Sequence, residues 1–304
     1  MPTPVISVQA DPASAASWAE LARHAEESGY AALLAPDHPG DGASPFVALA
    51  SAAALTTRLE LGTYVSHAGV REPLLLASDV ATLDLLSGGR ARLALGAGHT
   101  PAEWSMTGRT RPDVAGRVRR FLEVAEVTRA LLAGETVTRE GIAVEARLDS
   151  PRPVRLPVPF TFGGGNSTLL RWAGGHADVV GLTGLGRTLP DGHRHEVRWT
   201  GADVDRQVEL VAEGAKDRPR PPELEALVQR VEITDDAEKL ASELAPGLGM
   251  TVAEVLGCPY LWIGTVEEIV QAIDRDRERW GITRYVVRDD RLPAADRVLA
   301  RLRG

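Results

Sequence analysis

Short polar motifs follow several apolar segments of this 304-residue chain, and histidines and carboxylates recur in them. Asp37-His38 sets a carboxylate beside an imidazole, a pair that can hold one imidazole tautomer and exchange a proton near neutral pH. His99 and Glu103 lie four residues apart further along the chain. We therefore treat His38, His99 and Glu103 as candidates for proton transfer. The alternative for each of them is an ordinary turn or loop residue.

Two glycine-rich segments could bind a ligand through the backbone. Gly96-Ala97-Gly98 would let a flat ligand lie against the chain, but Pro101 replaces the third glycine of a dinucleotide fingerprint and is not expected to open that helix. Gly163-Gly164-Gly165-Asn166-Ser167 precedes a predicted helix, whose free N–H groups could bind a phosphate. A flexible turn is the alternative. The second segment lacks the Gly-Lys-Ser/Thr ending of a nucleotide-triphosphate loop.

One basic segment stands out in a chain of net charge -8. It carries five arginines in twelve residues, namely Arg109, Arg111, Arg117, Arg119 and Arg120. Two interpretations have equal weight: a solvated helix face, or a site for the anionic tail of a ligand near the turn at Gly98. No set of side chains has metal-binding spacing, so we expect no metal.

The composition narrows the class of partner. Net charge -8 and a pI near 5.5 disfavour nucleic acid. No apolar run is long enough for a membrane span, and the N-terminal residues lack a signal-peptide pattern. The single cysteine, Cys258, excludes an internal disulfide, and we expect it to be packed rather than reactive. We therefore expect a cytoplasmic protein that acts on a small molecule.

These motifs need a frame that brings them together, and short β-rich runs alternate with amphipathic runs throughout the chain. This alternation predicts an α/β fold of parallel strands with helical crossovers. The predicted strands are Val5–Gln9, Tyr30–Pro36, Leu59–Val65, Arg92–Leu95, Phe160–Phe162, Ala177–Leu182, Glu225–Ile233 and Arg284–Val287. Eight units without a break in composition favour one (β/α)8 TIM-barrel domain over residues 1–304; an open doubly wound sheet is the competing architecture. In such a barrel, functional residues follow the carboxyl ends of the strands.

Local signals mark the remaining elements. Ser44-Pro45 opens a predicted helix, Asp235 caps another, and Thr265 begins a third as part of a capping box with Glu268. Residues 136–148 alternate in polarity and predict a small hairpin outside the barrel. Residues 183–200 show little periodicity, so we predict an irregular excursion that covers the site.

Taken in order, the motifs resemble the luciferase-like family over nearly the whole chain. The resemblance rests on six short motifs: Asp37-His38, Leu61-Gly62-Thr63-Tyr64-Val65, Leu95-Gly96-Ala97-Gly98, Phe162-Gly163-Gly164-Gly165, His176-Ala177-Asp178 and Ile263-Gly264-Thr265. The family contains reduced-FMN monooxygenases and enzymes of the deazaflavin coenzyme F420, and the spacing is closer to the F420 branch. The resemblance thus implies hydride transfer between F420 and a small organic substrate. A reduced-FMN monooxygenase and a flavin-binding barrel without turnover are the alternatives.

The resemblance also implies roles for particular residues. Tyr64 and Val65 would form a bulge, often with a cis peptide, under one face of the ring, and Asp37 would contact its polar edge. The remaining implied cofactor contacts are Gly96, Ala97, Gly98, Gly163, Gly164, Gly165, Asn166 and Ser167. His99 stands where some F420 dehydrogenases carry a glutamate that acts as the general acid. The resemblance therefore does not imply that this protein shares the substrate of those enzymes. Dimers are common in the family, but the sequence leaves the oligomeric state open.

Overall fold

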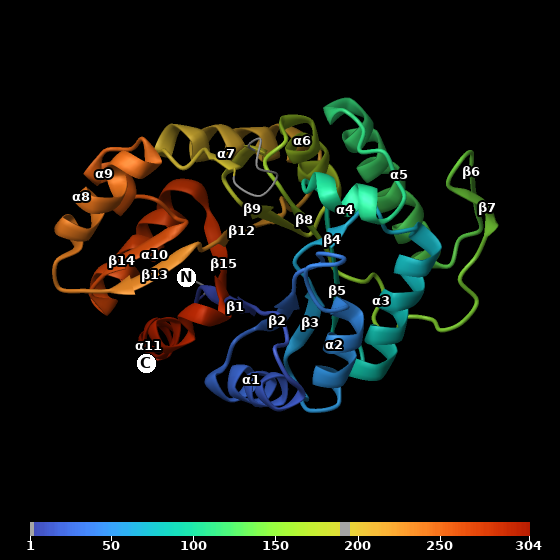
Figure 1. Cartoon of the computed structure of the whole chain (residues 1–304), viewed down its shortest axis with the longest axis horizontal. Coiled ribbons are helices and arrows are strands. Elements are labelled where there is room, and N and C mark those ends of the chain that lie inside the picture. Colours follow the sequence, from blue (N-terminus) through green and yellow to red (C-terminus); the bar gives the residue numbers. More distant parts are fainter. Residues whose placement is uncertain (1–2, 189–194) are drawn as a thin grey trace.

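A computed structural model describes residues 3–188 and 195–304, and it shows eight parallel strands closed into a barrel (Figure 1). The order around the barrel is β3, β2, β1, β15, β12, β9, β8 and β5, and pairing of β5 with β3 closes the ring. The strands are β1 Val5–Gln9, β2 Ala32–Ala35, β3 Glu60–Thr63, β5 Ala91–Gly96, β8 Phe160–Gly163, β9 Val179–Leu182, β12 Glu223–Leu227 and β15 Ile282–Arg288. The predicted closed barrel is confirmed, and the open sheet is excluded.

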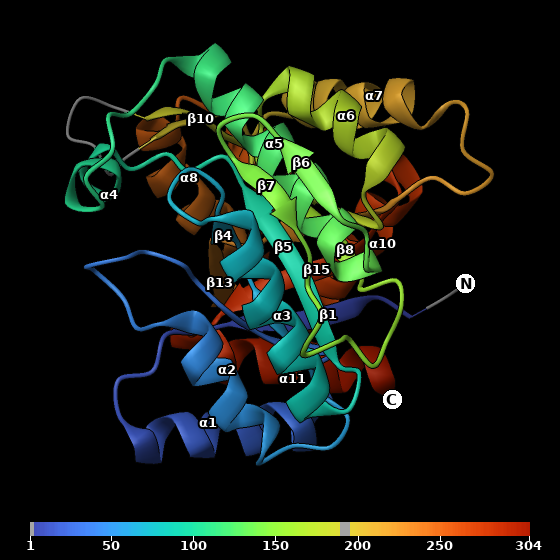
Figure 2. The same ribbon diagram turned by 90° about the vertical axis from the view of Figure 1, so that its right-hand side faces the viewer.

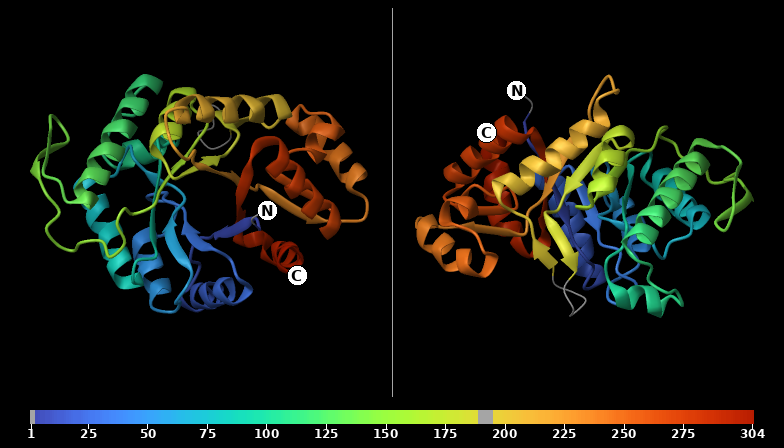
Figure 3. Two further views of the ribbon diagram at one scale, coloured as in Figure 1. Left: turned by 180° about the vertical axis from the view of Figure 1, so that it is seen from behind. Right: turned by 90° about the horizontal axis from the view of Figure 1, so that it is seen from above.

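Helices surround the barrel, as the view from behind and the view from above show (Figure 3). They are α1 Ala15–Ser28, α2 Pro45–Ala53, α3 Pro73–Ser87, α4 Pro101–Met106, α5 Val114–Ala133, α6 Ser167–His176, α7 Gly201–Ala215, α8 Ala237–Leu248, α9 Val252–Leu256, α10 Val266–Trp280 and α11 Leu292–Arg303. The capping box at Thr265 is confirmed, since its hydroxyl accepts from the Glu268 N–H. Within the described ranges, no helix has the length and apolar character needed to cross a membrane.

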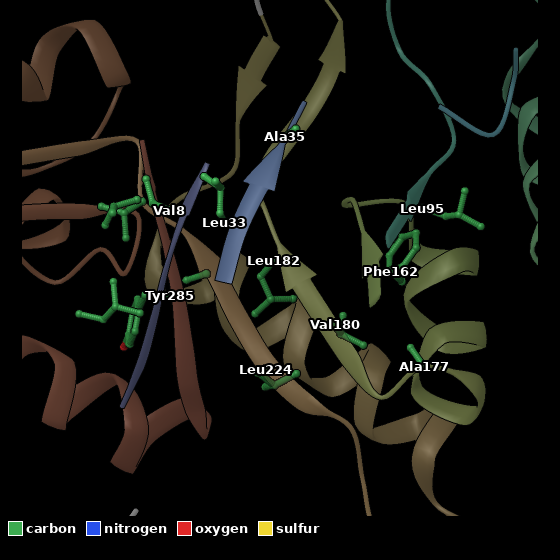
Figure 4. Close-up of a cluster of buried hydrophobic side chains, with 14 of the residues drawn as sticks. Val8, Leu33, Ala35, Leu95, Phe162, Ala177, Val180, Leu182, Leu224 and Tyr285 are labelled. Atoms are coloured by element: carbon green, nitrogen blue, oxygen red, sulfur yellow. The ribbon is translucent and has the colours of Figure 1, made fainter. Parts of the chain in front are cut away.

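Strand side chains alternate between two environments. Val8, Leu33, Phe162 and Tyr285 point outward and pack beneath the helices in the main core (Figure 4). Their neighbours point inward, where Ala32, Leu34, Tyr64, Leu227 and Val286 form a smaller apolar cluster. This period of two is what a barrel strand requires when both of its faces are buried.

A buried charge cluster fills another layer of the barrel interior. Glu225 is fully buried, 3.8 Å from Arg92 and 3.3 Å from Arg284. Two cations around one carboxylate compensate for its removal from water. Packed side chains therefore fill this layer of the barrel interior.

One predicted strand, one strand that we did not predict and one helix cap differ from the sequence analysis. The predicted strand Glu225–Ile233 is two strands, because Val228 N–H bonds to Val286 and Gln229 N–H bonds to Tyr260, which turns the chain out of the barrel. The second piece, β13 Arg230–Ile233, pairs with β14 Leu261–Gly264, a strand that we did not predict. Asp236, not Asp235, caps α8.

Two predicted segments outside the barrel also have defined structures. Residues 136–148 contain the predicted hairpin, made of β6 Val137–Arg139 and β7 Ala143–Ala146. The predicted irregular excursion is in part regular, because β10 Leu185–Thr188 pairs with β11 His195–Val197 in an antiparallel ladder; its residues 189–194 lie outside the described residues. Figure 2 shows β10 and α4 on the same side of the molecule.

Candidate active site

The glycines after two neighbouring strands lie side by side at the mouth of the barrel. β5 and β8 pair with Leu95 opposite Phe162, which brings Gly96 next to Gly163. Both glycines face the Val65 side chain: an added Cβ would lie 2.5 Å from it at Gly96 and 2.7 Å at Gly163. The predicted convergence of these turns is therefore present, and the missing side chains make room for Val65.

Val65 lies on the predicted bulge between β3 and β4 Ser66–His67. The Tyr64–Val65 peptide bond is cis, as the resemblance implied. The Gln9 side chain donates to the Tyr64 carbonyl oxygen, and Arg288 donates to Gln9 Oε1 at 3.3 Å. The Tyr64 ring points into the barrel and is 5% exposed, so it lies below the mouth rather than in it. Val65 is the half-buried apolar side chain at the mouth.

Asp37 is buried, and both of its carboxylate oxygens are already paired within the protein. Arg71 donates to Oδ1 at 2.7 Å and to Oδ2 at 3.0 Å, and the His67 backbone N–H donates to Oδ2 at 2.9 Å. A bidentate guanidinium of this kind holds a carboxylate in one orientation. In this geometry Asp37 ties β4 to the loop after β2, and its contact with the polar edge of the ring stays a prediction.

His38 and Glu103, two predicted proton-transfer residues, contact each other directly. His38 Nδ1 lies 2.7 Å from Glu103 Oε1, and the Glu103 side chain is 4% exposed. The hydrogen bond from Glu103 raises the pKa of His38 against the opposing effect of burial. Burial would raise the pKa of Glu103, but the hydrogen bond from His38 and the close approach of the His67 ring lower it to about 2. His38 Nε2 has no hydrogen-bond partner within the described residues, so it is available to a substrate.

Glu103 is placed there by α4, a helix that we did not predict. Pro101 occupies the first turn of α4, contrary to our expectation that it would not open a helix. Proline is favoured at that position because its missing N–H has no intrahelical partner there. The dinucleotide fingerprint is still absent, because Pro101 stands at the position of its third glycine.

His99 has different surroundings from His38. Its ring centroid lies 5.9 Å from that of His38 and 4.6 Å from that of His195, which β11 contributes. His99 is an exposed residue, although the rings of two other histidines lie close to it at the mouth. Desolvation of the ring, followed by the effects of His195 and His38, lowers the pKa of His99 to about 4. His99 is therefore a neutral imidazole at neutral pH, suited to accept a hydrogen bond rather than to donate a proton as an acid.

In the second glycine-rich turn, one residue already caps the helix α6 that follows it. Asn166 caps α6, with its Oδ1 accepting from the N–H groups of Thr168 and Leu169. The N–H groups of Thr168 and Leu169 in that first turn are therefore occupied. The N–H groups of Gly165, Asn166 and Ser167 have no partner in the described part of the chain, so they are the donors left for an anion.

Some arginines of the basic segment are paired within the protein, and others are free to contact an anion. Arg109 and Arg120 both pair with Glu72, and Arg117 bonds to the Pro112 carbonyl. Arg119 has no such partner among the described residues, and it lines two cavities of about 620 and 300 Å³ on either side of α5. Asn166 and Thr168 line the larger cavity. Of the five arginines, Arg111 and Arg119 thus have no partner among the described residues, and Arg119 is the one that lies beside the glycine-rich turn.

Taken together, the mouth fits a flat, phosphorylated ring cofactor. Val65 supplies an apolar surface, half-buried Ala97 and Gly98 leave the backbone accessible, and the amides at Gly165 to Ser167 can bind an anion. No group of His, Cys, Asp and Glu side chains in residues 3–188 and 195–304 is arranged to hold a metal ion.

Several residues of this site escaped the sequence analysis. Gln9, His67 and Arg71 hold the bulge and the polar pairs in place, and His195 contacts His99. Gln9 and His67 end a strand, so the rule that polar residues at carboxyl ends are functional could have identified them. Arg71 and His195 carry no such signal, because their placement depends on tertiary contacts.

A profile of the luciferase-like monooxygenase family matches residues 3–253, which is most of the chain. The protein belongs to this luciferase-like family. Its members include F420-dependent oxidoreductases and monooxygenases, so the family supports an enzyme of one of these kinds.

Two curated relatives illustrate this range. One is an F420-dependent glucose-6-phosphate dehydrogenase of Beutenbergia cavernae, 33% identical over 178 residues, which cover 54% of this chain and 52% of the relative. The other is a 4-hydroxyprotoasukamycin monooxygenase of Streptomyces nodosus subsp. asukaensis, 38% identical over 125 residues, covering 40% and 33%. The chain thus spans about half or less of the length of these relatives.

Solved structures share the barrel over its whole length. The coenzyme F420-dependent tetrahydromethanopterin reductase of Methanopyrus kandleri superimposes with a TM-score of 0.73, covering 99% of this chain and 97% of the other, at 21% identity. At this identity the likeness concerns the luciferase-like fold.

Proposed function

We propose that the protein is a coenzyme F420-dependent oxidoreductase that transfers a hydride between the deazaflavin and a small organic substrate. The observation that carries the proposal is the placement of Val65 between Gly96 and Gly163, beside the His38–Glu103 pair. An apolar surface for a ring and a proton donor are the two requirements of hydride transfer to a carbonyl group. F420, when bound, supplies the hydride chemistry.

The chain's own residues perform the remaining tasks. Val65 and the glycine turns orient the ring, and the amides at Gly165 to Ser167 bind its phosphate. His38 gives a proton to the substrate oxygen in the reducing direction and takes one back in the oxidising direction. Glu103 stabilises the protonated form of His38 in both cases. Arg119 supports the choice of F420, because its tail carries carboxylates beyond the phosphate.

The alternative is a reduced-FMN monooxygenase. The observation in its favour is the 38% identity, over 125 residues, to the 4-hydroxyprotoasukamycin monooxygenase. Titration of the purified protein with F420 and with FMN, each followed by quenching of cofactor fluorescence, separates the two. Tight F420 binding with weak FMN binding supports the proposal. Tight FMN binding without affinity for F420 overturns it. We keep the expectation of a cytoplasmic protein as part of this proposal.

A further inference from the structure

His67 is a buried histidine whose two ring nitrogens both face fixed groups. It lies in β4 with its side chain 4% exposed, and its Nδ1 accepts a hydrogen bond from the Gly69 backbone N–H at 3.0 Å. A ring nitrogen that accepts from a backbone amide carries no proton, so the proton of the neutral ring is on Nε2. That nitrogen lies 3.2 Å from Glu103 Oε2.

Neither of these two atoms forms a hydrogen bond of regular geometry with any described residue. They face each other at 3.2 Å as an ion pair, with an alignment outside that of a regular hydrogen bond. Buried polar atoms are rarely left without a partner, because an unpaired one costs about 1–3 kcal/mol. The facing pair therefore accounts for both atoms.

The surrounding residues prevent the His67 ring from turning. A Cβ on Gly98 would lie 1.8 Å from His67 Cε1, so the ring occupies the space that a side chain there would fill. The Trp104 ring packs edge-on at a centroid distance of 5.5 Å. The His67 backbone N–H is bonded to Asp37, which Arg71 holds in turn. The ring is thus fixed from several sides.

The result is a closed circuit of contacts. Asp37 holds the His67 backbone, the His67 ring faces one oxygen of Glu103, and the other oxygen of Glu103 faces His38, the residue next to Asp37. A carboxylate with only one of its oxygens held could rotate about its last bond. With both oxygens held, it presents a fixed acceptor to His38 Nδ1.

We infer that His67 is a positioning residue, which orients Glu103 and through it keeps His38 protonated with Nε2 facing the substrate. The charged and titratable groups that face His38 are Glu103 from α4, Asp37 and Asp41 from its own loop, and His99 after β5. The naming of His38 as proton donor rests on the proposed function. The circuit itself requires no cofactor.

Titration of the imidazole resonances by NMR, on the protein without added cofactor, tests the inference. His38 is assigned with the variant His38→Gln. We expect His38 to titrate above its usual pH in the wild-type protein, to return towards that usual pH in His67→Leu, and to recover in His67→Gln, whose amide can still donate to Glu103. His176→Gln, which changes an exposed histidine on α6, is the matched control and should leave His38 unchanged.

A His38 titration that is the same in His67→Leu as in the wild type overturns the inference. Should His67→Leu fail to fold, the 15N shifts of the wild-type protein decide. They should show His67 with its proton on Nε2, whereas a proton on Nδ1 contradicts the circuit. Because neither measurement contains a cofactor, a failure here is distinct from a failure of the F420 assignment.

With reduced F420 bound, the pH profile of hydride transfer gives a second readout. In His67→Leu the alkaline limb should move to lower pH while KM changes little, because His38 loses its proton earlier. A uniform loss of activity at every pH would indicate a merely structural role.

Discussion

His38 Nδ1 and Glu103 Oε1 lie 2.7 Å apart, although 65 positions separate the two residues in the chain. Glu103 is almost fully buried and His38 is 41% exposed, so the pair has a fixed inner half and an accessible outer half. This asymmetry is what a proton donor needs: the carboxylate sets the proton affinity, and the imidazole reaches the substrate.

His38→Gln should lower kcat for hydride transfer by about 100- to 10,000-fold, the usual contribution of a general acid or base. Cofactor binding should change by only a few-fold, because glutamine can still bond to Glu103. The dependence of the rate on pH should follow from the raised pKa of His38. The pKa of His38 is raised, so the wild-type rate of substrate reduction should hold at low pH and fall as pH rises through that pKa. In the variant this alkaline limb should disappear.

His99→Gln is the matched comparison at the same mouth. The pKa of His99 is lowered to about 4, so the ring is neutral at the pH of an ordinary assay and has no proton to give as an acid. The variant should therefore lose less than about tenfold in kcat, with a larger change in KM if His99 bonds to the substrate. If His99→Gln proves as inactive as His38→Gln, the assignment of the acid is wrong.

The difference between these two histidines could not be predicted from the sequence, whereas the frame that holds them could. Alternating segments and capping signals depend on neighbouring residues, so they predicted the closed barrel and the helix starts at Ser44 and Thr265. The pairing of Glu103 with His38 depends on α4, and the hold on Glu103 depends on His67 from another strand. The detachment of β13 from β12 likewise follows from bonds of Val228 and Gln229 to distant residues.

Gly163→Ala tests the support of Val65. The new Cβ would lie 2.7 Å from Val65 Cγ1, so Val65 must move from its place at the mouth. We expect cofactor affinity to fall about tenfold or more, since displacements of about 1 Å can cost that much, and stability to fall by about 1–3 kcal/mol. Gly247→Ala in α8, where a Cβ meets nothing within 4 Å, should leave the affinity unchanged and should not lower stability, since alanine favours a helix more than glycine does. Recovery of affinity in Gly163→Ala with Val65→Ala would attribute the loss to this contact.

Arg119→Gln tests the anionic end of the ligand. Arg119 is the exposed arginine that lines both cavities beside α5, and its charge should attract the carboxylates of the F420 tail more than FMN. F420 affinity at low salt should fall about tenfold, or roughly 1.4 kcal/mol, and less at high salt. Arg139→Gln, in the same larger cavity but paired with Glu126, is the control. Equal losses of F420 and FMN affinity would contradict a role specific to the tail.

Glu26 offers a test of the frame itself, away from the mouth. Its carboxylate accepts from the N–H groups of Thr57, Arg58 and Leu59 and so ties α1 to the start of β3. Burial would raise the pKa of Glu26, but these backbone hydrogen bonds lower it to about 2. Glu26→Gln should reduce the free energy of unfolding at pH 7 by about 1–3 kcal/mol, measured by urea denaturation.

Because the pKa in the folded state is lowered, the stabilisation by Glu26 is complete above its usual pKa of 4.5 and is lost as pH falls towards 2. The difference between variant and wild type should therefore shrink between pH 5 and pH 3, while Glu27→Gln, an exposed neighbour on α1, should show no such dependence.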